Sequence, residues 1–343
     1  MKTVLLAALL AFLISLVLTP VVIKNAVRFG LLDIPKDARR VHKKPIPISG
    51  GLAMYVAVMA GMVVFLDLTH ELIALMIGAT LITVCGLIDD KWEMSAKVKL
   101  ACQLLAAGIL VFGGSHIEFF TNPFPFGESV IFLKALAIPV TIFWVVGITN
   151  TVNLIDGLDG LAAGVSLISA VSLAVIAYKF EYNSVSVIAA LLAGSCLGFL
   201  PYNFNPAKIF MGDTGALFLG FMLSYISIEG IMKSAAALTI VVPVLILGVP
   251  VFDTTFAMVR RKLSGRGIMQ ADKGHLHHRL LALGLSQRQT VLILYGISII
   301  FGLLANLVAG VDAQIGLFIS LLTVINVVLI GKVSGMFKSK EEL

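Results

Sequence analysis

Acidic and amide side chains gather in four polar segments that interrupt an otherwise apolar sequence. The first segment ends an apolar run with the adjacent carboxylates Asp89 and Asp90. Two neighbouring carboxylates repel each other unless they share a cation or a proton. A divalent metal, an ammonium group or a raised pKa would satisfy this pair. Lys97 and Lys99 follow at the start of the next apolar run, where lysine side chains are suited to bind phosphate.

The second polar segment, residues 150–160, reads NTVNLIDGLDG between two apolar runs. Its polar side chains recur every three residues and are Asn150, Asn153, Asp156 and Asp159. On a continuous helix this spacing would spread them over half of the surface. Gly157 and Gly160 instead predict that the helix ends near Asn153 and that the chain folds back. Amide and carboxylate groups would then converge on one pocket.

The third polar segment, residues 202–215, contains Asn203 and ends in Met-Gly-Asp-Thr-Gly around Asp213. Asp213 directly precedes an apolar run, and Gly212 and Gly215 allow close approach of the backbone. Hard oxygen ligands of this kind suit Mg²⁺, which keeps several of its waters. Asp213 is also a good N-cap for the following helix, and the two interpretations are compatible.

The fourth polar segment, residues 260–290, is basic and contains the sequence His275-Leu276-His277-His278. Three histidines can bind zinc, but no cysteine is nearby and the neighbouring cations oppose a second cation. We therefore expect a loop that binds a polyanion, because arginine side chains match phosphate oxygens.

Composition indicates which elements must position these residues. Of the 343 residues 59% are hydrophobic and 13% are charged, and mean hydropathy is +1.03. These values exclude a disordered chain, a disulfide-stapled secreted domain and an ordinary soluble enzyme. The three cysteines all lie in apolar runs and predict neither a disulfide framework nor a metal pair.

We predict an all-α, polytopic membrane helix bundle of about 11 transmembrane helices that forms a single domain over residues 1–343. Pro243, Gly248 and Pro250 predict a break in the ninth helix, either as a groove for a lipid tail or for packing alone. A hairpin or turn is expected in residues 115–129. The predicted spans are Thr3–Ile23, Ser49–Leu66, Leu72–Ile88, Val98–Gly114, Val130–Thr149, Leu161–Tyr178, Ser184–Leu200, Ala216–Ile231, Leu238–Val259, Val291–Val311 and Ile315–Gly331.

The basic residues predict the orientation of this bundle. With the N-terminus outside and the C-terminus in the cytoplasm, 21 of the 25 lysines and arginines fall on the cytoplasmic side. The four polar segments then share that side, where nucleotides are available. Their carboxylates suit a metal, their basic loop suits phosphates, and the bilayer admits a lipid acceptor. These features favour phosphoryl transfer from a nucleotide-linked donor to a lipid.

Four motifs in order carry a family resemblance. Asp89-Asp90, NTVNLIDGLDG, NFNPAKIFMGDTG (residues 203–215) and HLHHRL (residues 275–280) resemble the polyprenyl-phosphate N-acetylhexosamine-1-phosphate transferase superfamily. One branch of it makes the first lipid intermediate of peptidoglycan and typically has three consecutive histidines and a PTMGG motif. This chain has His-Leu-His-His and, at residues 47–51, PISGG. It therefore looks like the other branch, the bacterial undecaprenyl-phosphate GlcNAc-1-phosphate transferases.

The resemblance implies transfer of GlcNAc-1-phosphate from UDP-GlcNAc to undecaprenyl phosphate, which releases UMP and starts teichoic acid or O-antigen assembly. It implies Mg²⁺, or Mn²⁺ in its place, and a multi-pass protein of the bacterial plasma membrane with a cytoplasmic active site. It leaves a homodimer open and implies no nucleic acid partner. The residue roles implied are metal binding for Asp213 and Asn153, catalysis for Asp89, Asp90, His277 and His278, and substrate binding for Lys43, Lys44, Lys99, Asn150, Asp156, Asp159, Asn203, Arg266 and His275.

Three alternatives remain at this point. The first is the phospho-MurNAc-pentapeptide transferase of peptidoglycan synthesis. The second is an anion or lipid transporter, which would place its site near the bilayer midplane and often contains internal repeats. The third is an intramembrane aspartyl protease, which needs two facing aspartates within spans. The polar motifs lie at span ends and no repeat is evident, so both non-transferase alternatives are disfavoured.

Overall fold

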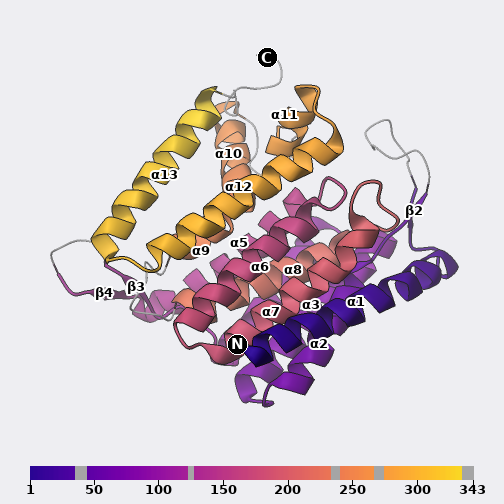
Figure 1. The fold of residues 1–343 in the computed structure, drawn as a ribbon, viewed down its shortest axis with the longest axis horizontal. Coiled ribbons are helices and arrows are strands. Elements are labelled where there is room, and N and C mark those ends of the chain that lie inside the picture. The colour runs from indigo at the N-terminus through magenta and orange to yellow at the C-terminus, as the bar shows by residue number, and fades with distance from the viewer. Residues whose placement is uncertain (35–44, 123–126, 233–239, 266–273, 334–343) are drawn as a thin grey trace.

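The computed structural model describes residues 1–34, 45–122, 127–232, 240–265 and 274–333, and these are almost entirely helical (Figure 1). The α-helices are α1 (Lys2–Arg28), α2 (Gly51–Phe65), α3 (His70–Trp92), α4 (Ala96–Phe112), α5 (Ala137–Ile155), α6 (Leu161–Lys179), α7 (Asn183–Asn203), α8 (Gly212–Ser227), α9 (Val241–Ile246), α10 (Gly248–Leu263), α11 (Leu276–Ala282), α12 (Gln287–Val308) and α13 (Ala313–Val333). A 3₁₀ turn, η1 (Lys134–Leu136), precedes α5, and a π-helical turn, η2 (Ile228–Met232), extends α8.

Helix α8 forms the centre of the bundle. All of its residues are buried except Asp213, which is only partly exposed. It packs against α2, α3, α5, α6 and α7, so its apolar side chains have neighbours on every side. A helix that is apolar all round belongs in such a core. Its first turn therefore carries Asp213 to one end of the bundle.

Small residues let several helices approach closely. The buried face of α1 repeats every fourth residue through Ala7, Ala11 and Ser15, and it meets Gly194 and Gly198 of α7. Close packing over small residues is the usual way for helices to associate within a membrane. The first turn of α8 is approached in the same way by two further helices, because Gly51 of α2 contacts Gly215 and Gly86 of α3 contacts Thr214.

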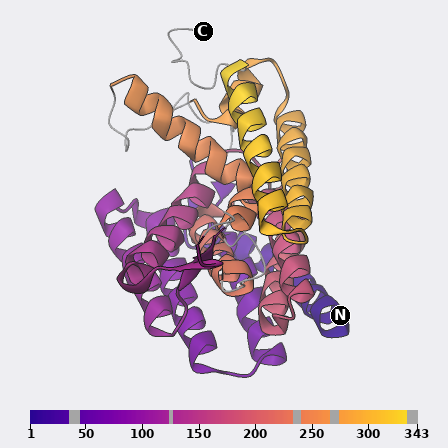
Figure 2. The ribbon, with the colours of Figure 1, turned by 90° about the vertical axis from the view of Figure 1, so that its left-hand side faces the viewer.

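The predicted ninth helix is broken, as Pro243, Gly248 and Pro250 indicated. Helix α9 ends at Ile246, Leu247 has non-helical backbone angles, and α10 begins at Gly248. Figure 2 shows α10 projecting away from the pair formed by α12 and α13. Whether the break serves a lipid tail remains a prediction.

Two short antiparallel hairpins supplement the helices. β1 (Leu32–Asp33) pairs with β2 (Ile46–Pro47), and β3 (Phe119–Thr121) pairs with β4 (Val130–Phe132). The second hairpin confirms the turn that was predicted for residues 115–129. It also corrects the predicted span that began at Val130, because the alternating β-branched and aromatic residues at its start form a strand.

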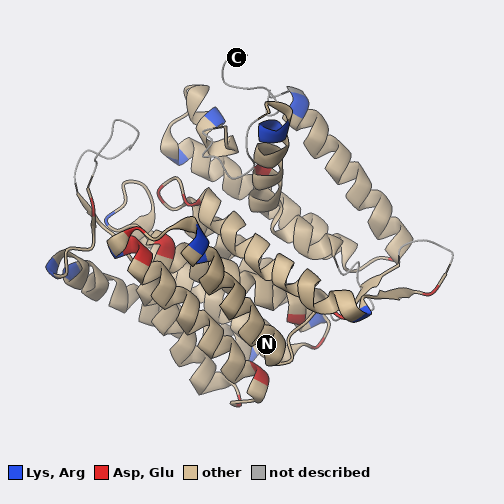
Figure 3. Cartoon of the chain, turned by 180° about the vertical axis from the view of Figure 1, so that it is seen from behind, with Lys and Arg blue, Asp and Glu red and all other residues tan. Residues whose placement is uncertain are grey.

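In the described residues each of the eleven predicted spans overlaps helix, although the fifth begins in β4 and the ninth is divided between α9 and α10. Eight helices there are long and apolar enough to cross a bilayer, and α2 is apolar but has only 15 residues. The all-α, polytopic membrane class is thereby confirmed, whereas the count of eleven crossings and the location of the termini stay predictions. Figure 3 shows a group of acidic residues with basic residues nearby at the upper side of the bundle, and further acidic and basic residues at the opposite side.

Candidate active site

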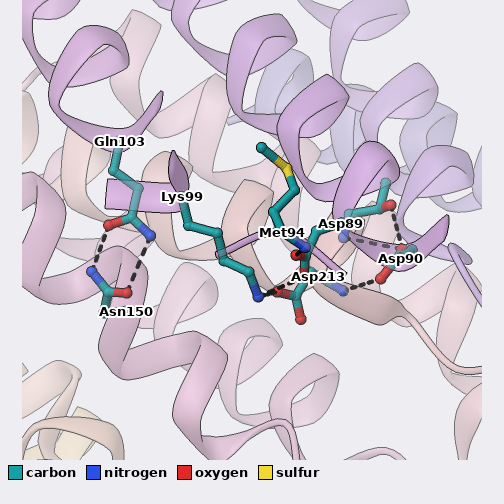
Figure 4. Close-up of polar contacts among 8 residues, drawn as sticks. Asp89, Asp90, Met94, Lys99, Gln103, Asn150 and Asp213 are labelled. Atoms are coloured by element: carbon teal, nitrogen blue, oxygen red, sulfur yellow. Dashed lines mark hydrogen bonds and ion pairs between the residues drawn. The ribbon is translucent and has the colours of Figure 1, made fainter. Parts of the chain in front are cut away.

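Two carboxylates and one ammonium group meet at the end of α3. The Nζ atom of Lys99, on α4, lies 2.5 Å from Oδ2 of Asp89 and 2.7 Å from Oδ2 of Asp213 (Figure 4). The backbone N–H of Met94 donates to the other oxygen of Asp89 at 2.6 Å. Lys99 thus shares its charge between Asp89 and Asp213, which are 124 residues apart in the sequence. Of the adjacent pair Asp89 and Asp90, this ammonium group contacts Asp89, whereas Asp90 has donors of its own.

Asp90 is held by a different set of donors. Its Oδ2 accepts from the hydroxyl of Ser49 at 2.7 Å and the hydroxyl of Thr214 at 2.5 Å, and its Oδ1 accepts from the Asp213 N–H at 2.8 Å. The Thr214 N–H lies 3.3 Å from Oδ2. The carboxylate therefore caps the first turn of α8, where backbone N–H groups have no helical partner. Asp90 fixes the backbone on which Asp213 stands.

An open cavity of about 510 Å³ lies beside this cluster, within the size range of ligand sites in proteins. Its polar lining includes carboxylates, amides and one imidazole from segments that are far apart in the sequence. The residues that line it are Asp33, Ile46, Ile48, Asn153, Asp156, Gly157, Leu158, Asp159, Asn203, Asn205, Pro206, Ala207, Phe210, Gly212, Asp213, His278 and Gln287.

The loop after α5 brings two aspartates to the cavity. Asp156 follows the last residue of α5, and its pKa is raised to about 8 by burial and by the neighbouring carboxylates of Asp213, Asp90 and Asp159. Crowded carboxylates of this kind favour a bound proton or cation. The carboxylate of Asp159 instead accepts from the Asn205 amide at 2.9 Å and from the Ala207 N–H at 3.0 Å.

Asn203 and Tyr295 hold the loop after α5 through hydrogen bonds to Gly160. The side chain of Asn203 is 2% exposed, accepts from the Gly160 N–H at 3.1 Å and donates to the Ile209 carbonyl at 3.0 Å. The hydroxyl of Tyr295, on α12, donates to the Gly160 carbonyl. These bonds join the segments that follow α5 and α7, so the acidic loop is attached to the rest of the cavity wall.

The histidines occupy different environments. His278 lines the cavity, whereas His275 and His277 are buried. Burial, and secondarily His278, lowers the pKa of His277 to about 4, so this ring is neutral at pH 7. Its Nε2 lies so close to Gly157 that a Cβ atom there would come within 2.7 Å. The histidine segment therefore packs directly on the acidic loop.

The structure brings most of the predicted site residues together. Those that line the cavity are Asn153, Asp156, Asp159, Asn203, Asp213 and His278. Asp89, Asp90 and Lys99 contact the first turn of α8 next to it, and His275 and His277 lie behind His278. The predicted Lys43, Lys44 and Arg266 fall outside the described residues.

Asn150 does not line the cavity. Its amide exchanges two hydrogen bonds with Gln103 of α4, at 3.1 and 2.6 Å, and also donates to the Val146 carbonyl (Figure 4). The helical spacing explains this placement, because Asn150 lies a turn further into α5 than Asn153 and faces the neighbouring helix. The pair joins α4 to α5 close to Lys99.

Sequence reasoning missed several residues of the site. Thr214 and Asn205 stood within a recognised motif, and their hydrogen-bonding side chains beside Asp213 and Asn203 were a usable signal. Ser49 stood within the PISGG motif but was not singled out, and Asp33 and Gln287 had no signal, because each lies in a segment of ordinary composition. Only the fold brings Gln287 within 2.7 Å of the Asn205 amide.

Within the described ranges, no three His, Cys, Asp or Glu side chains converge closely enough to form a protein-only metal centre. The cavity instead offers separate carboxylate and amide oxygens from Asp213, Asp156 and Asn153. This donor set fits Mg²⁺, which is bound through one or two carboxylates together with substrate phosphates and retained waters.

Comparison of the sequence with known proteins assigns this chain to a family. Residues 72–231, which include both aspartate clusters and the start of α8, match the model of glycosyl transferase family 4. A probable undecaprenyl-phosphate N-acetylglucosaminyl 1-phosphate transferase of Bacillus subtilis is 43% identical over 341 residues, which cover 99% of this chain and 94% of the relative. The chain belongs to glycosyl transferase family 4. The resemblance drawn from the motifs is thereby confirmed.

Two other relatives are less similar to this chain. A decaprenyl-phosphate N-acetylglucosaminephosphotransferase of Mycolicibacterium smegmatis is 36% identical over 79% of this chain and 73% of its own length. A phospho-N-acetylmuramoyl-pentapeptide-transferase of Staphylococcus aureus is 30% identical over 87% of this chain and 96% of its own length. All three relatives are named as transferases, so this chain is an enzyme of that class.

Proposed function

We propose that this protein transfers GlcNAc-1-phosphate from UDP-GlcNAc to undecaprenyl phosphate, giving undecaprenyl-diphosphate-GlcNAc and UMP. The observation that carries the proposal is the cavity where Asp213, Asp156 and Asp159 meet, in a chain 43% identical to the B. subtilis relative. The peptidoglycan alternative is less favoured, because the S. aureus relative is 30% identical.

Asp213 and Asn153 are the residues that would hold Mg²⁺, or Mn²⁺ in its place. Both line the cavity, and the pKa of nearby Asp156 is raised first by burial and then by neighbouring carboxylates, whose negative charge a cation would offset. When bound, such an ion neutralises the donor diphosphate and the charge that develops on the leaving UMP. Asp213 and Asn153 themselves orient the diphosphate relative to the acceptor.

The binding site of the acceptor phosphate is assigned to the region of Lys99 and Asp89. One of its oxygens attacks the phosphorus that bears the sugar, and the bond to UMP breaks with its electron pair leaving on UMP. A phosphate monoester has a second pKa of about 6, so the acceptor is mostly a dianion at pH 7. General base catalysis is therefore modest, and positioning and charge neutralisation dominate. Asp90 acts as a positioning residue, because four donors already occupy its carboxylate.

The donor is assigned to the remainder of the cavity. Asp159, Asp156 and Asn203 belong to the wall that would surround the nucleotide, and His278 faces the same space. Neutral His277 supports His278 rather than supplying positive charge. The basic residues predicted for the diphosphate, Lys43, Lys44 and Arg266, keep that role as a prediction.

The proposal places the enzyme in the bacterial plasma membrane with its active site on the cytoplasmic side. The supporting observations are the eight apolar helices and the 21 basic residues on the predicted inner side. The product would start a teichoic acid, O-antigen or other envelope glycan. A homodimer is part of the same expectation.

A radiolabel assay with purified full-length protein tests the function. We expect transfer from UDP-GlcNAc to undecaprenyl phosphate in the presence of Mg²⁺, with UMP as co-product, and much slower transfer from UDP-MurNAc-pentapeptide. The opposite preference would assign the protein to the peptidoglycan branch. Solute uptake into vesicles without UMP release would indicate a transporter. A phospho-GlcNAc–enzyme adduct trapped without acceptor would show a covalent route instead of direct attack.

A further inference from the structure

A buried carboxylate outside the cavity controls the histidine segment. Asp253, in α10, is 3% exposed and does not line the cavity. Its Oδ2 lies 2.8 Å from Nδ1 of His275, and its Oδ1 accepts from the Leu276 N–H at 2.6 Å. A buried charge needs such partners to offset the loss of water. Both oxygens of Asp253 are therefore directed at the start of α11.

The Asp253 contact fixes the protonation site of His275. A carboxylate only accepts hydrogen bonds, so Nδ1 of His275 must carry the proton. The His275 ring is stacked on that of His277 at 5.8 Å between centroids, with 8° between the planes. The His277 ring in turn lies 4.2 Å from that of His278. A continuous series of ring contacts thus leads from Asp253 to His278 in the cavity wall.

The middle ring of this series, that of His277, also contacts the loop after α5. His277 packs on Gly157, which lies between Asp156 and Asp159. A displacement of the first turn of α11 would therefore move His278 and remove the contact between His277 and Gly157.

We propose that Asp253 is a positioning residue for the transfer reaction. It holds His275 with its proton on Nδ1 and holds the first turn of α11, and through them it sets His278 against the donor diphosphate. This inference rests on the proposed function for its choice of substrate. It assigns to Asp253 a role in the reaction, in addition to its structural contact with the start of α11.

The substitution Asp253→Asn tests the proposal. Asparagine has the same shape, but its NH₂ group cannot accept from Nδ1–H, so one of the two bonds to the histidine segment is lost or His275 changes tautomer. Loss of a partner that orients a functional histidine typically lowers activity about 10- to 100-fold. We expect that loss in kcat for UDP-GlcNAc, and partial rescue by Asp253→Glu. Thr255→Val is the matched control, because its exposed hydroxyl bonds only to the Val251 carbonyl of its own helix.

A double-mutant cycle separates positioning from structural support. If Asp253 acts through His275, Asp253→Asn changes kcat less than about twofold when His275 is already glutamine, because coupled residues are not additive. A multiplicative loss in the double variant, or wild-type kcat in Asp253→Asn, would overturn the proposal. Thermal unfolding midpoints of all variants show whether each protein is folded.

A measurement on the wild-type protein keeps the inference testable if the variants do not fold. ¹⁵N NMR of histidine-labelled protein in lipid nanodiscs should show His275, assigned with His275→Gln, protonated at Nδ1. A bare Nδ1 would overturn the proposal. This result is independent of the substrate, whereas absence of transfer by the wild type from UDP-GlcNAc would refute the proposed function alone.

Discussion

The adjacent residues Asp89 and Asp90 have different environments. Asp89 shares the ammonium group of Lys99 with Asp213, next to the cavity. Asp90 is surrounded by hydroxyl and N–H donors from Ser49, Asp213 and Thr214. Successive residues of a helix point in directions about 100° apart, so one carboxylate can face the reaction while its neighbour caps another helix.

Asp213→Asn should abolish transfer and leave the fold intact. The amide keeps the shape of the side chain but cannot supply the charge that a divalent cation requires. We expect turnover to fall by about 10³-fold or more, since a metal contributes several kcal/mol to the transition state. The rate at saturating Mg²⁺ is the measurement, with Asp67→Asn, an exposed carboxylate far along the chain, as control. Near-wild-type turnover would refute the metal assignment.

The raised pKa of Asp156 predicts a pH-dependent response to Mg²⁺. With a pKa of about 8 in the folded, metal-free protein, Asp156 holds a proton that the unfolded chain has lost above about pH 4. Metal-free stability should therefore fall as pH rises from 4 to 8. A cation competes with the same proton, so Mg²⁺ affinity should tighten by up to about tenfold per pH unit below 8.

Thermal unfolding with and without Mg²⁺ between pH 6 and 9 measures this response. The stabilisation by Mg²⁺ should increase toward pH 8 and then level off. Asp156→Asn should flatten the dependence, because the competing proton is gone. An unchanged slope in that variant would assign the effect to another group.

At the scale of elements, the first turn of α8 is the point where helices converge. Gly51 of α2 and Gly86 of α3 both contact its backbone, and Asp90 caps it. The position of Asp213 therefore depends on two glycines that have no reactive side chain and act only by allowing close helix packing. Helix packing here determines catalytic geometry directly.

Gly51→Ala should disturb the site through packing alone. Its Cβ atom would collide with the backbone of Gly215, and overpacking of this kind typically costs about 1–3 kcal/mol. We expect a lower unfolding midpoint and a loss of kcat. Gly108→Ala in α4 is the matched control, because a Cβ there meets nothing within 4 Å and alanine favours helix. Equal effects of the two substitutions would contradict the role of close packing.

The sequence predicted the helices better than their contacts. Long apolar runs located each span, and Pro243 and Gly248 located the break between α9 and α10. The motifs also selected the residues that converge on the cavity. They could not show that Asn150 pairs with Gln103, or that Ser49 reaches Asp90 across 41 residues. Such pairings depend on the register between helices, which the periodicity of a single segment does not determine.

At the scale of the whole molecule, the site belongs to one side of a membrane bundle. Its lining extends from Asp33 near the N-terminus to Gln287 at the start of α12. The polar segments that form the site are among those predicted to be cytoplasmic from the basic residues, so a test of the orientation of the chain also tests the side on which the chemistry occurs.

Cysteine labelling in intact cells checks this orientation. Lys179→Cys, at the end of α6, should react with a membrane-impermeant maleimide from outside, and Lys262→Cys, at the end of α10, should react only after permeabilisation. Both positions are exposed. A Cys102→Ser background removes the cysteine that is not fully buried. The reverse labelling pattern would place the active site on the outer side.

Asp90 and the first turn of α8, which it caps, are far apart in the sequence, and this separation has a consequence for biosynthesis. Thr214 follows Asp90 by 124 residues, so a ribosome that adds 5–20 residues per second needs roughly 6–25 s to deliver it. During that interval α3 has entered the bilayer with its two carboxylates unpaired by α8. A carboxylate without its protein donors must keep its water, so we expect the end of nascent α3 that carries Asp89 and Asp90 to stay at the membrane–water interface until α8 emerges.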